Sequence, residues 1–156
     1  MIKGTFSENL KVSYLYQGAA NAVACDVVDT SEFNYGAFVV LHTGSSDTDL
    51  VLTLYEATDV AAGTNAAITT TVPIFHNTDV TSADILSATT AAYAYTIDTG
   101  NYPNSMVVFE IDPAILSQGY PCCYLADSGG NASNVCTILW VGDPKVKGQT
   151  QLSAIA

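Results

Sequence analysis

The residue types that carry most enzyme chemistry are scarce in this 156-residue chain. Its two histidines, His42 and His76, each end an apolar stretch without a distinctive motif around them. A serine, cysteine or threonine nucleophile needs a base beside it. The sequence has no Gly-x-Ser-x-Gly motif, no phosphate-binding glycine loop and no His-Glu-x-x-His pair. We therefore expect both histidines to be structural and the protein not to be an enzyme.

Two pairs of carboxylates have spacings at which they could meet a hard cation. These pairs are Asp47 with Asp49 and Glu110 with Asp112. A calcium loop needs more oxygen ligands than either pair offers, and a glycosidase needs two carboxylates facing one cleft. Fifteen acidic residues also give many chance pairs. Asp47 and Asp112 are better explained as turn caps, and the sequence predicts no metal and no other cofactor.

The four cysteines do not have the spacing of a metal site. They form no Cys-x-x-Cys pair and lack histidines at zinc-ligand spacing. Cys25 and Cys136 stand in apolar stretches, where a free thiol behaves as a small buried hydrophobe. Cys122 and Cys123 are adjacent, so in a strand they point to opposite faces. At most one of these two is expected in the core.

Trp140 stands in the apolar run that also contains Ile138 and Leu139. An exposed tryptophan could serve as a platform for stacking a sugar ring. The apolar neighbours instead favour packing in the core or in an interface.

Charge is both rare and one-sided in this sequence. Only 12% of the residues are charged, and fifteen acidic residues face four lysines and no arginine, for a net charge of −11. Nucleic acid is excluded as a partner, because a phosphate backbone needs cationic neutralisation. A surface so poor in charge favours contacts with other proteins; the alternative is a monomer with a threonine-rich surface. The lysines Lys3, Lys11, Lys145 and Lys147 all lie near the chain ends.

No run of apolar residues approaches the roughly 18 residues of a membrane span. The first residues, Met-Ile-Lys-Gly-Thr-Phe-Ser-Glu, contain no apolar core of a targeting segment. We expect a soluble protein with no membrane partner, made in a cytoplasm.

Runs of β-branched and aromatic residues between turn-forming residues predict eight or nine strands. Leu50, Leu52 and Leu54 share one face of such a strand, which predicts one face in a core. Strands 35–42 and 49–56 are expected to pair as a hairpin, and helical turns are expected at 82–86 and after Asp112-Pro113. The predicted strands span residues 11–17, 22–28, 35–42, 49–56, 68–76, 93–98, 104–111, 120–126 and 135–141.

Many short strands without a dividing linker favour an all-β domain built as a two-sheet β-sandwich. Jelly-roll and Greek-key strand orders both remain open. Residues 1–12 are expected to form an N-terminal arm and the start of the first strand, residues 11–141 the sandwich, and residues 142–156 an extended C-terminal tail.

The order of four segments, 6–12, 52–64, 107–112 and 139–145, resembles small virion proteins of tailed bacteriophages. Some proteins of that group decorate or cement the phage head. The resemblance implies a structural protein on the capsid exterior, with the major capsid protein as its partner. It also implies an oligomer, often a homotrimer, that holds capsid subunit junctions together.

In this setting the chain ends are the expected attachment points. The candidate residues for capsid or subunit binding are Lys3, Phe6, Lys11, Lys145 and Lys147. One alternative is a phage neck, tail or fibre component. A second alternative is a carbohydrate-binding sandwich whose platform would be Trp140 or exposed tyrosines.

Overall fold

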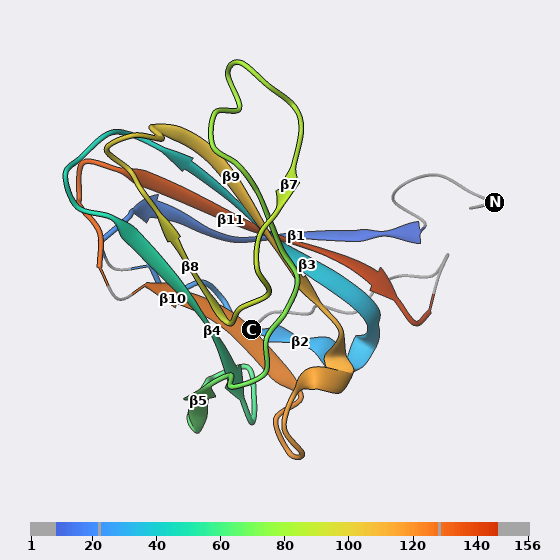
Figure 1. Cartoon of the computed structure of the whole chain (residues 1–156). Helices are drawn as coiled ribbons and strands as arrows, with labels where there is room; N and C mark the ends of the chain where they lie inside the picture. Colours follow the sequence, from blue (N-terminus) through green and yellow to red (C-terminus); the bar gives the residue numbers. More distant parts are fainter. Residues whose placement is uncertain (1–8, 22, 128, 147–156) are drawn as a thin grey trace.

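The chain folds into two antiparallel sheets packed face to face (Figure 1). The structure is a computed structural model and describes residues 9–21, 23–127 and 129–146. Within these residues it has strands and two single 3-10 turns, which confirms the predicted all-β sandwich. In chain order the elements are β1 (Lys11–Ala19), β2 (Val28–Asp29), η1 (Thr30–Glu32), β3 (Phe33–Thr43), β4 (Leu50–Ala57), β5 (Asn65–Ala67), β6 (Ile74–Asn77), β7 (Ser87–Ala88), β8 (Ala94–Ile97), β9 (Asn104–Ile111), η2 (Pro113–Ile115), β10 (Cys122–Asp127) and β11 (Val135–Pro144).

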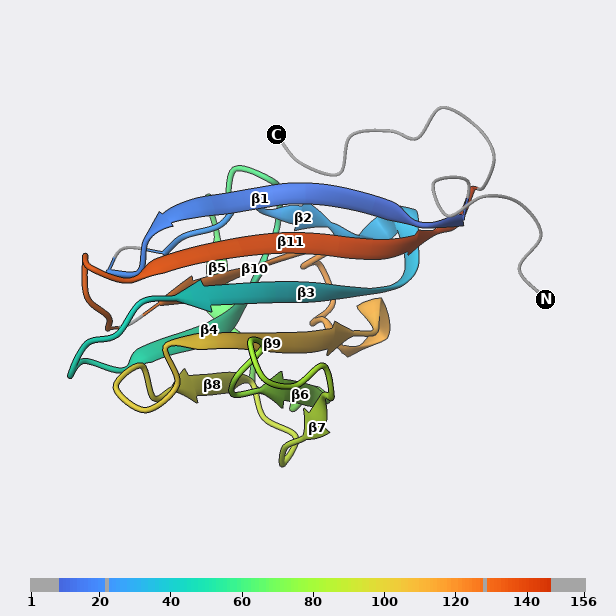
Figure 2. The ribbon, with the colours of Figure 1, turned by 90° about the horizontal axis from the view of Figure 1, so that it is seen from above.

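The strand order is that of a jelly roll. The first sheet runs β1-β11-β3-β9-β6-β7, and the second runs β2-β10-β4-β5, with β8 also pairing with β4. Without β5, β6 and β7, the sheets are β1-β11-β3-β9 and β2-β10-β4-β8, the eight strands of a double-sheet jelly roll. The three extra strands lie between β4 and β8 in the chain: β5 pairs with β4 in the second sheet, whereas β6 and β7 extend the first sheet beyond β9 (Figure 2).

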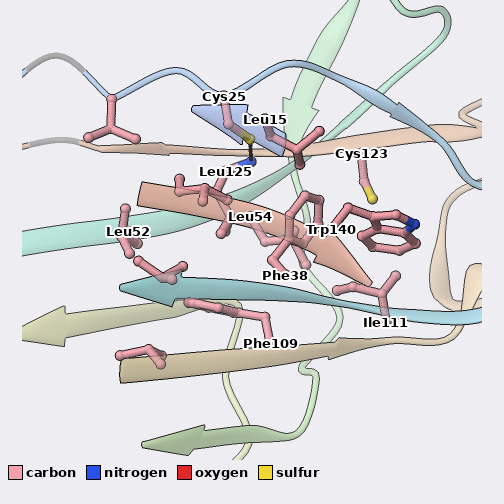
Figure 3. Close-up of a cluster of buried hydrophobic side chains, with 14 of the residues drawn as sticks. Leu15, Cys25, Phe38, Leu52, Leu54, Phe109, Ile111, Cys123, Leu125 and Trp140 are labelled. Atoms are coloured by element: carbon pink, nitrogen blue, oxygen red, sulfur yellow. Dashed lines mark hydrogen bonds between the residues drawn. The ribbon is translucent and has the colours of Figure 1, made fainter. Parts of the chain in front are cut away.

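The core fills the space between the two sheets (Figure 3). Leu50, Leu52 and Leu54 all point inward and are fully buried, as their alternation predicted. Opposite them, Phe38 and Phe109 are fully buried on the first sheet. Burial of each such side chain stabilises the folded state by about 1.5–3 kcal/mol relative to leaving it exposed. This core fixes which face of every strand points outward.

The prediction that strands 35–42 and 49–56 pair as a hairpin is wrong. Both strands form, but β3 pairs with β11 and β9, whereas β4 pairs with β10, β5 and β8. The connection at residues 44–49 therefore crosses from one sheet to the other. Local turn residues indicate a reversal of the chain, but they do not decide which sheet the next strand joins.

The predicted strand at 22–28 and the predicted helical turn at 82–86 are also largely absent. Of the first segment, the described residues 23–28 contribute only the Ala24–Ala126 bridge and the start of β2. Near the second, the Asp79 carboxylate accepts hydrogen bonds from Ser82 Oγ at 2.6 Å and from Thr81, so a capped turn precedes β7. The helical turn after Asp112 is confirmed as η2, with Asp112 Oδ1 accepting from Ala114 N.

The last strand runs further than the sequence indicated. Gly142 and Pro144 pair with Gly36 and Phe33 of β3, so β11 continues three residues into the range predicted as tail. Residues 1–8 and 147–156 of the predicted arm and tail lie outside the described residues.

Candidate interaction surfaces

The histidine His42 lies inside the sandwich and has no access to a substrate. It points inward from β3 and is 1% exposed. Burial lowers the pKa of His42, because the protonated ring loses its hydration. Of the two structural places expected for a histidine, the surface and the core, His42 therefore occupies the core.

The other histidine, His76, lies at a small pocket where β6 and β9 of the first sheet face β8 of the second. Its ring stacks on Tyr95 at a centroid distance of 5.7 Å. Tyr102, Asp98 and Ser105 are among the other lining residues, and the volume is about 50 Å³. A pocket of this size holds a few water molecules but not a sugar ring.

Three aspartates surround a shallow polar hollow next to this pocket. Asp47 and Asp49 come from the β3–β4 connection, and Asp98 lies opposite them. The Asp98 carboxylate accepts from Asn101 Nδ2 at 2.7 Å and from Asn101 N at 3.1 Å, and these bonds lower its pKa. Within the described residues, no group of three histidine, cysteine, aspartate or glutamate side chains is arranged to hold a metal ion.

The cysteines are all buried and free. Cys25 Sγ accepts a hydrogen bond from Leu125 N at 3.2 Å, drawn in Figure 3, and Cys136 lies in the same core. Cys122 and Cys123 do point to opposite faces, and Cys123 lies in the core between the sheets, but the prediction that at most one of them lies in a core is wrong. A second small apolar cluster, which includes Val27 and Ala57, covers Cys122.

Trp140 is fully buried, so it cannot be a sugar platform. Its ring meets Phe38 edge-on at a centroid distance of 5.0 Å and Phe33 at 5.4 Å. Of the two environments that its apolar neighbours predicted, the core or an interface, Trp140 therefore occupies the core.

The two ends of the described chain lie next to each other. Lys11 at the start of β1 pairs with Gly142 near the end of β11, so both strands have their outer ends at one end of the sandwich (Figure 2). Lys145 is the first residue after β11, and its Nζ donates a hydrogen bond to Ser31 O at 2.5 Å. Among the predicted binding residues the structure thus brings Lys11 and Lys145 together at what we call the terminal end. Lys3, Phe6 and Lys147 lie outside the described residues.

The outward-pointing residues of the first sheet are mostly apolar away from the strand ends. We call eleven outward-pointing residues of β1, β11, β3 and β9, named at the end of this paragraph, the outer face; the outward polar residues Gln17, Thr43 and Asn104 border it away from the chain ends. Tyr14 is 55% exposed there, Val12 49% and Val135 43%. The face comprises Val12, Tyr14, Ala37, Val39, Leu41, Met106, Val108, Val135, Thr137, Leu139 and Val141.

Charged side chains lie at one margin of this face. In its four strands the acidic residues are Glu110 and Asp143, both toward the terminal end. Tyr35 lies beside them, and partial burial together with a hydrogen bond to Glu110 raises the pKa of its hydroxyl. The centre of the outer face therefore carries no charge.

Sequence reasoning missed the outer face although the sequence contains a signal for it. Val39 and Val40 in β3, and Val107 and Val108 in β9, make both faces of these strands apolar. A strand with one solvated face alternates apolar and polar residues, whereas a strand covered on both faces reads as a continuous apolar run.

No family model matches the chain, and no curated protein sequence matches it. Among solved structures it is similar to the SPBc2 prophage-derived protein YomS, with 12% identity over 86% of this chain and 92% of that chain and a TM-score of 0.46. It is also similar to the Yersinia pseudotuberculosis-derived mitogen (8% identity, 96% and 95% covered, TM-score 0.30) and to the Tobacco streak virus coat protein (9%, 97% and 95%, TM-score 0.22). At such identities and TM-scores a likeness says nothing about what the chain binds.

No helix in the described part of the chain has the length and hydropathy needed to cross a membrane.

Proposed function

We propose that the chain is a non-enzymatic virion structural protein: a decoration or cement protein that binds the outside of a phage head. In this role it stabilises the junctions between subunits of the major capsid protein, after synthesis in the host cytoplasm. The observation that carries the proposal is the terminal end. Both chain ends leave the sandwich side by side, at the place where Lys11 and Lys145 lie.

The distribution of charge supports attachment through this end. The chain has a net charge of −11, and its four lysines all lie within residues 1–11 and 145–156. The acidic body is repelled by DNA, which fits a place outside the head and not a nucleic-acid partner. Extended segments that bind along a neighbouring subunit add contact area to an interface at an entropic cost.

The jelly-roll order is compatible with this role but does not establish it. Jelly rolls form viral capsid domains and also lectin domains, so the fold alone does not decide between structural and sugar-binding functions. The homotrimer implied by the sequence resemblance stays a prediction, and the dimer inferred in the next subsection is the alternative to it.

The proposal is tested by removing the chain ends and measuring occupancy on purified phage heads. Deletion of residues 1–8 or of residues 147–156 leaves β1 and β11 complete. We expect each truncated protein to keep the circular dichroism of the full chain and to lose most of its binding to heads. Ile85→Ser is a control, because Ile85 is 72% exposed between β6 and β7 and its change should leave occupancy unaltered. Full occupancy by both truncated proteins would contradict attachment through the terminal end.

Two alternatives remain as proposals with different outcomes. A neck, tail or fibre component would appear in cryo-microscopy of the virion at one ring or one appendage and not over the whole head. A carbohydrate-binding module would need exposed tyrosines such as Tyr93 or Tyr102, since Trp140 is buried. Binding to a glycan array without binding to heads would favour that alternative.

A further inference from the structure

The central strands of the first sheet are apolar on both sides, although only one side is covered. Inward, Phe38 and Val40 of β3 are fully buried in the sandwich core. Outward, the next residues of the same strand are again apolar. Such a pattern is typical of strands covered on both faces. The sequence of these strands therefore fits a sheet with a second layer over its outer face.

The strand registers bring the outward side chains into one continuous row. Tyr14 of β1 lies opposite Leu139 of β11, which lies opposite Val39 of β3. Val39 in turn pairs with Val108 of β9, and Val108 with Phe75 of β6. The row crosses five neighbouring strands without a charged residue. It is a surface on which another apolar layer can pack without desolvating an ion.

The area of the outer face is sufficient for a specific contact. Four strands about 4.8 Å apart and about eight residues long cover roughly 500 Å² in projection, with the polar residues that border the outer face included. Two copies of such a face would bury about 1,000 Å² in total, which is the lower end of the range for specific interfaces. Apolar patches on monomeric soluble proteins rarely exceed a few hundred Å².

We propose that the outer face packs against the outer face of a second copy of this chain, so that the protein forms a two-fold dimer through its first sheet. The two sheets would lie about 10 Å apart, as in the packing of two sheets within a sandwich. A face that meets its own copy is isologous and closes with two chains, whereas a trimer needs two different contact surfaces on each chain.

Charge identifies the second copy as the occupant. A chain of net charge −11 repels its own copies over most of its surface. The uncharged centre of the outer face is where two copies can meet without opposing carboxylates. A cationic partner would be attracted instead to acidic places such as the hollow of Asp47, Asp49 and Asp98. An uncharged apolar face is complementary to another uncharged apolar face, and the second copy supplies one.

The test is the mass of the full-length protein in solution with and without a charge on the outer face. We expect sedimentation velocity at rising protein concentration to approach twice the chain mass of 16.3 kDa. Val39→Lys places an ammonium group in the central row and should weaken the dimer at least roughly tenfold, because the buried charge has no partner. Val51→Lys is the matched control. Val51 is also a half-buried valine in a central strand, but it lies on the outward side of the second sheet, so this variant should still dimerise.

The variants also separate this inference, which concerns contacts between copies, from the proposed attachment to heads. Circular dichroism and thermal unfolding confirm that both lysine variants fold. A wild-type protein of single-chain mass at all concentrations would overturn the inference, as would a trimer or a dimer that Val39→Lys leaves intact. A third result is a monomeric wild type together with loss of head binding in the Val39→Lys variant. It would show that the outer face contacts the capsid, which overturns the inference of a dimer and leaves the proposed function standing. Two results together would support both the dimer and the proposed attachment to heads. Val39→Lys would dissociate the dimer, and only deletion of a chain end would abolish head binding.

Discussion

Burial of His42 between the sheets makes the stability of the folded protein depend on pH. The pKa of His42 is lowered in the folded state, because burial disfavours the protonated ring. As the pH falls below about 6.5, the unfolded chain binds a proton at His42 that the folded chain does not bind, and unfolding becomes more favourable. We expect the melting temperature of the wild type to fall between about pH 7 and pH 5, and that of His42→Leu to change less.

A second, more acidic transition provides an internal control for this experiment. Hydrogen bonds from Ser82 and Thr81 lower the pKa of Asp79, and those from Asn101 lower that of Asp98. Their contribution to stability is present above the ordinary aspartate pKa of about 3.8 and is lost as the pH falls further. Both proteins should therefore lose stability below about pH 4. An identical loss for wild type and His42→Leu between pH 7 and 5 would show that His42 does not cause it.

The cysteines should be unreactive in the folded protein. Burial raises the pKa of Cys25 and Cys136 to about 12 and that of Cys122 to about 11, and the thiolate is the reactive form. We expect an aromatic disulfide reagent at pH 8 to modify no thiol of the native chain within minutes, and all four in guanidinium chloride. Ser45→Cys, in the exposed β3–β4 connection, should react at once. Rapid reaction of a native thiol would show that the core opens locally.

Residue-level reasoning predicted the buried residues that stand in continuous apolar runs, namely Cys25, Cys136 and Trp140. It failed for Cys122, because the alternation of a strand tells which residues share a face but not whether a loop covers that face. Val60 and Ala62, which pack against the cluster that covers Cys122, lie about sixty residues away in the sequence.

Packing between neighbouring strands makes Gly36 of β3 necessary for the position of Trp140 in β11. A Cβ atom at residue 36 would overlap the six-membered ring of Trp140. We expect Gly36→Ala to lower the free energy of unfolding by about 1–3 kcal/mol, the usual cost of overpacking a core. Urea unfolding measures this loss.

The same substitution at Gly63 is the control, because the nearest atom to a Cβ there is Asp59 Oδ2 at 3.9 Å. Gly63→Ala should change stability by no more than about 0.5 kcal/mol. Combining Gly36→Ala with Trp140→Phe should cost less than the sum of the two single changes, since the smaller ring leaves room for the methyl group. Strict additivity would mean that the overlap with Trp140 is not the cause.

At the level of elements, the long strands could be predicted and their partners could not. The predicted strands at 35–42, 49–56, 104–111 and 135–141 all form. They could be predicted because their apolar runs are long enough to be recognised from the local sequence. Pairing is set by residues distant in sequence, so β3 joins β11 rather than β4. The short strands β5 and β7 have three and two residues and exposed side chains, which leaves no periodicity to detect. The apolar doublets of β3 and β9 indicate an outer face, but its extent could not be predicted because it depends on the register of four strands at once.

At the level of the whole molecule, net charge and the outer face act in opposite directions on association. Two copies that meet through the outer face bring two charges of −11 close together, and this repulsion is screened by salt. The apolar contact itself is nearly unaffected by moderate salt. We therefore expect the dimer to tighten on the order of tenfold between about 0.01 M and 0.15 M sodium chloride, as the Debye length falls from about 30 Å to about 8 Å.

Sedimentation equilibrium at a series of salt concentrations measures this effect. Val39→Lys should remain a monomer throughout, whereas Val51→Lys should follow the wild type, with a slightly weaker salt dependence because each chain carries one positive charge more. A contact held by lysine–carboxylate pairs at the terminal end would respond in the opposite sense, since salt weakens exposed ion pairs. A dimer that dissociates as salt is added would therefore place the contact between copies at the terminal end and not on the outer face.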